Sequence, residues 1–216
     1  MSDRASILGA IRSAKRTAHA SEDIAREAAA LVAEPQAIQP NFEGATLLDR
    51  FVAKATSERV TATVDQVATM GEVPAAVSGY LQRVEQESSI CVQGGAPLEE
   101  LDWTSFDLTA RLEEDGRCAV TYAEYGIAET GSVVFKSGAH GPILMNFLPL
   151  YHIVVLRAAN LIGYSEDLWP LLGGANVPQS RLLTLVTGTS GTADIEARNV
   201  RGAHGPKHMH IVIVAD

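Results

Sequence analysis

The sequence Tyr151-His152-Ile153-Val154-Val155-Leu156 contains a continuous apolar run of strand length. Its apolar residues do not alternate with polar ones, which is typical of a strand buried on both faces. A second run of this kind covers residues 209–214. Strands of this type need cover on both faces, so they favour an α/β fold in which helices lie over a mostly parallel sheet.

Helical and strand patterns alternate on the amino-terminal side of this run. Apolar residues at helical spacing predict helices at residues 47–52 and 67–86, with Pro74 near a start or a kink. Short strands are predicted at residues 60–64 and 89–92. This alternation is the signature of a parallel sheet in a three-layer α/β domain.

The remaining segments divide the chain into an extension and one domain. Residues 118–135 have strand character twice, with a break at 126–131, and 182–186 is a further strand. Short helices are predicted at 142–148 and from Ser165 to near Gly173. Residues 2–32 read as Ala-rich helices, and prolines at 35 and 40 suit an extended linker. We therefore expect a helical extension at 1–40 and an α/β domain at 41–216.

Composition excludes several classes of partner. The formal net charge of the 216 residues is −9, which argues against nucleic acid or an anionic membrane as the main partner. No apolar run reaches the roughly 18 to 20 residues needed to span a bilayer, so we expect a cytoplasmic protein. Cys91 and Cys118 are the only cysteines, and their positions suggest neither a disulfide framework nor a thiolate metal site. We expect no cofactor on this chain.

Glu129 is the first candidate for chemistry, followed by Thr130 and Gly131 between two predicted strands. A glycine lets the backbone turn or approach a ligand closely, and a carboxylate there can act as a general base or a nucleophile. The alternative is structural, with the carboxylate accepting backbone N–H bonds that fix a hairpin.

A second candidate is the loop Thr187-Gly188-Thr189-Ser190-Gly191-Thr192. We predict a helix beginning near Ala193, capped by Thr192, with Asp194 and Glu196 near its positive end. Backbone amides and hydroxyls before a helix can hold phosphate or carboxylate, so a small anionic ligand is expected. Capping alone would also explain the pattern.

The third candidate is His204, in a loop with Gly205 and just before Lys207. An accessible imidazole can bind a ligand or transfer protons near neutral pH. His208 and His210 alternate onto one strand face, but no third ligand is identified by spacing, so no metal site is predicted. We interpret His152 as a hydrogen-bonded core residue for which the Glu129 carboxylate is a reasonable partner.

Four ordered motifs carry a resemblance to a known family. They are Ala128-Glu129-Thr130-Gly131, Leu148-Pro149 with Tyr151-His152, Thr192-Ala193-Asp194-Ile195-Glu196 and Gly202-Ala203-His204-Gly205-Pro206. Their order is similar to that in the LUD-domain family, and the resemblance covers residues 118–214. The family usually has proline where this chain has Thr189, and a polar or basic residue where it has Gly191.

The resemblance implies a fold similar to the superfamily of sugar-phosphate isomerases, CoA-transferases and formyltetrahydrofolate cyclo-ligases. It also implies a role in oxidising L-lactate to pyruvate beside cysteine-rich iron-sulfur subunits. Our hypothesis places Glu129, His204 and the 187–192 loop in one crevice at the ends of the strands, where open α/β sheets bind ligands. Two alternatives remain, an independent enzyme of the cyclo-ligase or CoA-transferase type that uses Glu129 directly, and a purely structural subunit.

Overall fold

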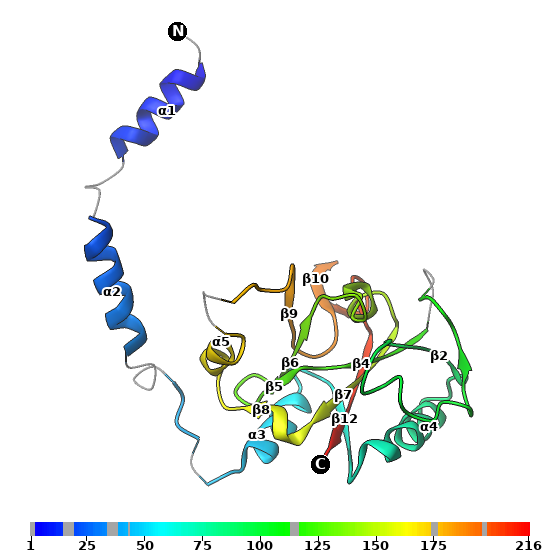
Figure 1. Cartoon of the computed structure of the whole chain (residues 1–216). Coiled ribbons are helices and arrows are strands. Elements are labelled where there is room, and N and C mark those ends of the chain that lie inside the picture. Colours follow the sequence, from blue (N-terminus) through cyan, green and yellow to red (C-terminus); the bar gives the residue numbers. More distant parts are fainter. Residues whose placement is uncertain are drawn as a thin grey trace. The chain divides into compact units, whose positions relative to one another are not determined.

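The computed structural model describes residues 3–14, 20–33, 39–42, 44–112, 117–173, 177–195 and 198–216. Its contacts divide the chain into a unit of residues 1–41 and a unit of residues 42–216 (Figure 1). The first unit contains the predicted helices as α1 (Asp3–Ala14) and α2 (Ser21–Ala33). No side chain of α1 is buried. Most of the predicted linker, including Pro35, lies outside the described residues.

The second unit is built on a six-stranded sheet in which every pairing is parallel. In spatial order the strands are β1 (Thr63–Val67), β12 (His208–Val214), β7 (Tyr151–Arg157), β4 (Cys118–Tyr122), β2 (Ser89–Val92) and β3 (Asp107–Leu108). The two apolar runs of the sequence are the neighbours β7 and β12. Ile153, Val154, Ile211 and Val212 have no exposed surface. The predicted α/β class with a mostly parallel sheet is confirmed.

One face of this sheet is covered by α4 (Val73–Arg83), which follows a short 3-10 turn, η2 (Met70–Glu72). Val77 and Leu81 of α4 pack with Ile153 and Val212. Pro74 lies in the first turn of the helix, where its missing N–H removes no helical bond. The predicted helix at 67–86 is therefore real but shorter, because β1 continues to Val67.

The other face is covered by α3 (Leu47–Ala55) and a second sheet. Its spatial order is β8 (Leu161–Ile162), β5 (Tyr125–Ile127), β6 (Ser132–Lys136) and β9 (Leu183–Val186). Phe51 of α3 and Val133 of β6 pack with Leu156 and Ile211. Thr46 and Asp49 form a capping box that starts α3.

Short helical segments complete the unit. They are η3 (Ile143–Asn146), η4 (Ala158–Asn160), η5 (Ser165–Asp167) and α5 (Leu168–Leu171). The predicted short helices at 142–148 and from Ser165 are present as η3 and as η5 with α5. Leu168 of α5 packs on the outer face of the second sheet against Ile127 and Val134. No helix in the described ranges has the length and apolarity needed to cross a bilayer.

The helix predicted near Ala193 is wrong. Residues there form β10 (Gly191–Ile195), which pairs antiparallel with β11 (Arg198–Arg201). Thr192 pairs with Val200, and β-branched residues of this kind favour a pleated strand over a helix when a partner strand is available. Thr192 therefore caps no helix, and Asp194 is an exposed strand residue. Glu196 lies outside the described residues.

The strand predicted at 60–64 begins only at Thr63. Thr61 has φ of 61°, in the left-handed region, and this conformation prevents the strand from starting earlier. Gly188, which has φ of +72°, packs against this turn. A Cβ atom at position 188 would collide with the carbonyl oxygen of Val60. The 187–190 loop and the turn at Val60 therefore fit together only with glycine at 188.

We expect Gly188→Ala to lower the free energy of unfolding by roughly 2 to 4 kcal/mol, because it adds left-handed strain to a collision with backbone. Urea denaturation followed by circular dichroism measures this change. Gly138→Ala is the matched control, since a Cβ there meets nothing within 4 Å and the residue has no positive φ. Equal stability of the two variants would contradict this account of the loop.

Candidate functional site at the amino-terminal edge of the sheet

The amino-terminal ends of three central strands lie in register. Tyr151, the first residue of β7, pairs with Cys118 of β4 on one side and with His208 of β12 on the other. Parallel strands that start at the same level bring the loops before them to the same edge of the sheet. The segments that precede β4, β7 and β12 therefore meet, although they are far apart in the sequence.

These segments enclose a depression with a volume of about 760 Å³. Its lining residues come from the segment after α4, the residue before β4, the loop before β7 with the first residue of that strand, and the loop before β12: Gln86, Arg117, Phe147, Leu148, Pro149, Leu150, Tyr151, Gly202, Ala203, His204 and Gly205. Two of the family-like motifs, Leu148-Pro149 with Tyr151 and Gly202 to Gly205, thus form one surface.

The depression has a basic side and an apolar side. Among the described residues that line it, Arg117 and His204 are the ionisable side chains apart from Tyr151, and none is Asp or Glu. Both are exposed, as is Lys207 just beyond Gly205. Phe147, Leu148 and Leu150 form an apolar wall and are 42%, 43% and 40% exposed. In a chain of net charge −9, a surface that combines basic side chains with an apolar wall favours an anionic ligand that also has an apolar part.

Backbone hydrogen bonds fix the loops around the depression. The Ser190 N–H donates to the Pro206 carbonyl at 2.8 Å, and the Gly202 N–H donates to the Ser190 carbonyl at 3.1 Å. The N–H groups of Lys207 and His208 both donate to the Leu150 carbonyl at 3.0 Å. The predicted 187–192 loop therefore acts as a brace for the loop that carries His204.

Thr189 ties the brace to the rest of the domain. Its N–H donates to the Val60 carbonyl at 3.1 Å, and its side chain is hydrogen-bonded to Thr61 and to Nη1 of Arg201. A proline at this position would lack the N–H that reaches Val60. Since the amides of Thr189 and Ser190 are both bonded within the fold, and no helix follows, neither amide is free to hold an anion as the sequence suggested.

Glu129 lies elsewhere. It occupies the tight turn between β5 and β6, where Gly131 has φ of +71° and backs closely onto Ala55 of α3. The Glu129 N–H donates to the Gly163 carbonyl, and Oε2 lies 3.5 Å from the Ser165 N–H. Glu129 is not among the residues that line the depression. The crevice predicted to hold both Glu129 and His204 is therefore not what the structure forms.

A row of hydroxyl groups connects the Glu129 turn to the brace. Thr130 Oγ1 lies 2.7 Å from Ser132 Oγ, which lies 2.6 Å from Thr187 Oγ1. These bonds hold β6 against β9 where the two strands adjoin the turn and the brace. Thr130, Gly188 and Ser190 therefore contribute to contacts that hold the loops around the depression in place. Of the predicted site residues, only His204 and Gly205 line the depression itself.

His152 is a buried core residue, as predicted, but its partner is not Glu129. Its Nε2 lies 2.7 Å from Thr121 Oγ1 on β4, and its ring lies beside Phe135. Nδ1 has no hydrogen-bond partner. Desolvation by burial lowers the pKa of His152 to about 3, so the ring is neutral in the folded protein.

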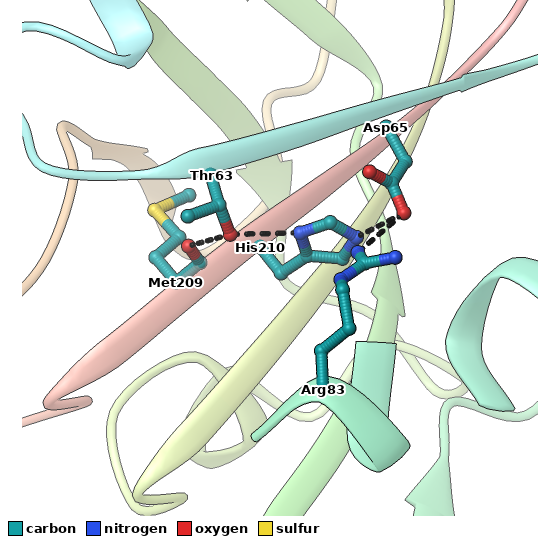
Figure 2. A network of polar contacts seen from close by, with 5 residues as sticks. All are labelled: Thr63, Asp65, Arg83, Met209 and His210. Carbon is teal, nitrogen blue, oxygen red and sulfur yellow. Dashed lines mark hydrogen bonds and ion pairs between the residues drawn. The ribbon is translucent and has the colours of Figure 1, made fainter. Parts of the chain in front are cut away.

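His210 is the second buried imidazole and belongs to a polar network between β1, β12 and α4, which Figure 2 shows. Its Nδ1 lies 2.8 Å from Thr63 Oγ1, and its ring stacks on Tyr80 with centroids 4.0 Å apart. Nε2 faces Asp65 Oδ2 at 3.5 Å, too far for a good hydrogen bond, because that oxygen accepts from Arg83 Nη2 at 2.6 Å.

Burial is the main cause that lowers the pKa of His210, to about 4; Arg83 lowers it further, while Asp65 opposes the shift. Burial also raises the pKa of Tyr80 to about 12. Both rings are therefore neutral near pH 7, and the network joins the edge strand β1 to the centre of the sheet. A neutral imidazole of low pKa is a poor general base, which favours a structural role.

His208 and His210 point to the same face of β12, as the alternation predicted. The His208 ring stacks on Tyr151 with centroids 4.5 Å apart, and burial together with Lys207 lowers its pKa. Among the side chains that the structure describes, no three His, Cys, Asp or Glu residues are placed to hold a metal ion.

Sequence reasoning missed Arg117 and the apolar wall. Arg117 directly precedes a buried strand, which was the one available signal. Its significance depends on β4 pairing with β7 so that Arg117 stands beside the start of β7, and strand order cannot be read from the sequence of one strand.

Fold and edge geometry together define an α/β protein with a basic, half-apolar ligand-sized depression. The model of the LUD domain matches residues 98–214, more than half of the chain. The chain belongs to the LUD-domain family.

Comparison with curated proteins agrees with this membership. The chain is 30% identical to the Escherichia coli K12 protein YkgG over 64% of this chain and 58% of that protein. It is 28% identical to Lactate utilization protein C of Halalkalibacterium halodurans over 55% of this chain and 53% of that protein. It is also 32% identical to the Deinococcus radiodurans protein of that name over 45% and 43%. The chain spans about half the length of these relatives.

A solved structure supports the fold alone. A DUF162 family protein from Deinococcus radiodurans superimposes with a TM-score of 0.60 at 20% sequence identity. The match covers 78% of this chain and 96% of that protein chain.

Because of the two buried imidazoles, we expect the free energy of unfolding to fall in acid. Both folded pKa values lie below the usual 6.5, so below pH 6.5 the unfolded chain binds protons that the folded chain does not. Stability is therefore complete above pH 6.5 and falls as the pH drops toward 4, by roughly 3 kcal/mol per imidazole. Urea unfolding at a series of pH values measures this fall.

Protonation of carboxylates also lowers stability in this pH range. The variant His210→Gln therefore isolates the contribution of His210. Its unfolding free energy should fall less between pH 6.5 and 4 than that of the unaltered chain, by roughly 3 kcal/mol. Parallel pH profiles for the two proteins would show that His210 is not neutralised by the fold.

Proposed function

We propose that this chain is a subunit or accessory protein of L-lactate utilisation that binds a small carboxylate in the depression beside Arg117 and His204. The names of the curated relatives support the pathway. The observation that carries the binding role is the position of Arg117 and His204 beside an apolar wall. The process we propose is the cytoplasmic oxidation of L-lactate to pyruvate.

Each part of the depression has a role in this proposal. The planar guanidinium of Arg117 is suited to two parallel hydrogen bonds with a carboxylate. His204 adds a donor on the neighbouring loop, and Lys207 lies on the same loop just outside the depression. The close approach of Gly205 to Ser190 holds that loop in place. Phe147 and Leu150 offer apolar surface for the remainder of the ligand.

Electron transfer is assigned to partner subunits. Iron-sulfur clusters are held by sets of cysteine thiolates, typically four. This chain has only Cys91 and Cys118, which are both buried. Burial raises the pKa of both thiols, that of Cys118 to about 12, so neither is suited to be a thiolate ligand. The donor set does not fit a cluster, and we propose that cysteine-rich partner subunits carry the iron-sulfur clusters.

One specific observation favours a second candidate function. Glu129 is half-buried on a tight turn beside a left-handed glycine, a position similar to that of a nucleophile carried on a turn. An independent enzyme of the cyclo-ligase or CoA-transferase type would use this carboxylate directly. A purely structural subunit would use neither Glu129 nor the depression.

Lactate-dependent reduction of an artificial electron acceptor separates these functions. We expect reduction only when the purified chain is mixed with its cysteine-rich partners. Reduction by the chain alone would overturn the subunit role. Stable co-assembly with those partners that is unaffected by every change in the depression and by Glu129→Gln would indicate a structural subunit.

The variant Arg117→Gln should weaken binding of L-lactate or pyruvate by about tenfold to a hundredfold, because it removes a charge-assisted hydrogen bond. Isothermal titration calorimetry with each acid as the probe measures the dissociation constant. Arg111→Gln is the matched control, since Arg111 is exposed and does not line the depression. Equal binding by both variants would show that the depression is not the site.

A further inference from the structure

The edge strands of the six-stranded and the four-stranded sheet differ in how they are protected. A strand edge presents unpaired N–H and C=O groups, and proteins usually shorten it, charge it or interrupt it. β3 and β8 are only two residues long. β1 carries Asp65, which forms an ion pair with Arg83. β9 is the exception.

β9 has four residues, Leu183-Thr184-Leu185-Val186, with no charge and no proline, and its pairing with β6 is regular. Among the described strands only β6 pairs with it, so its second edge is open. Leu182 and Thr187 extend the uncharged segment on both sides. β-branched and apolar residues of this kind favour addition of another strand.

The outward face of this edge is apolar as well. Leu183 packs toward Ile127 and Val134, and Leu185 lies on the same face by alternation. Leu185 is 42% exposed. Nearby on α5, which covers that face, Trp169 and Leu171 are 56% and 51% exposed. Val186 points to the opposite face, into the core beneath the sheet.

We propose that β9 pairs antiparallel with β9 of a second copy of this chain, which joins the two four-stranded sheets into one. The segment is nearly palindromic about Thr184, and this symmetry is what a two-fold interface requires. With Thr184 on the axis, Leu183 faces Leu185 of the second copy and Leu182 faces Val186. Every cross-strand pair is then apolar or Thr with Thr, both of which are favourable.

The absence of charged residues on β9 favours an uncharged partner strand, such as β9 of a second copy, over a charged partner. Each chain has net charge −9, so two copies repel at a distance, yet β9 itself places no like charges opposite each other. Added salt screens the distant repulsion and leaves backbone pairing intact. The dimer should therefore become tighter, not weaker, as the salt concentration rises.

Sedimentation velocity of the full chain tests the proposal, with the protein varied from about 1 to 100 µM. We expect a species of twice the 23.0 kDa chain mass. Leu185→Lys should weaken dimerisation by at least about tenfold, because it places a charge opposite an apolar residue. Leu108→Lys, on the exposed edge strand β3, is the matched control and should dimerise as the unaltered chain does. A monomer throughout, or equal effects of the two variants, overturns the proposal.

A cysteine on the proposed axis tests the register independently. Thr184→Cys should form a disulfide-linked dimer under mild oxidation, since residue 184 would face its own copy at a distance that a disulfide can span. The native Cys91 and Cys118 are buried and do not compete. Gln66→Cys on the exposed edge of β1 is the control. Cross-linking of both variants alike, or of neither, would contradict pairing through β9.

Discussion

The parallel pairing of β7 with β12 is the constraint on which the second unit depends. Both strands carry continuous apolar residues, so neither face of the pair can meet water without loss of roughly 1.5 to 3 kcal/mol for each large side chain left exposed. α4 covers one face, and α3 with the second sheet covers the other. The three layers of the unit therefore follow from the need to bury both faces of these two strands.

The same pairing creates the candidate site. Tyr151 and His208 stand next to each other at the start of the two strands, and the loops that lead into them must meet at that edge. The Leu150 carbonyl receives two N–H bonds from the loop before β12, which locks the two entrances together. Arg117 joins them because β4 begins at the same level. The depression is therefore a consequence of strand register rather than of any one motif.

Two imidazoles lie inside the central pair, one on each face. His152 contacts Thr121 beneath the second sheet, and His210 contacts Thr63 beneath α4. Each uses one ring nitrogen for a hydrogen bond, while the other lacks one. Such groups remain neutral because protonation would bury an uncompensated charge. They give the core polar specificity and leave the exposed His204 as the imidazole open to a ligand in the depression.

Local sequence pattern determined much of the architecture. The apolar runs of β7 and β12, the helical spacing of α3 and α4 and the buried role of His152 were all predictable, because burial and periodicity leave their mark on neighbouring residues. Membership of the LUD-domain family was also readable from ordered motifs. The prediction of a helix at Ala193 was wrong because residues 191–195 pair with the strand at 198–201, and this pairing outweighs a local capping pattern. Only the tertiary structure separated Glu129 from His204 and brought Arg117 to the depression, because strand order and register depend on contacts between distant segments that no local pattern encodes.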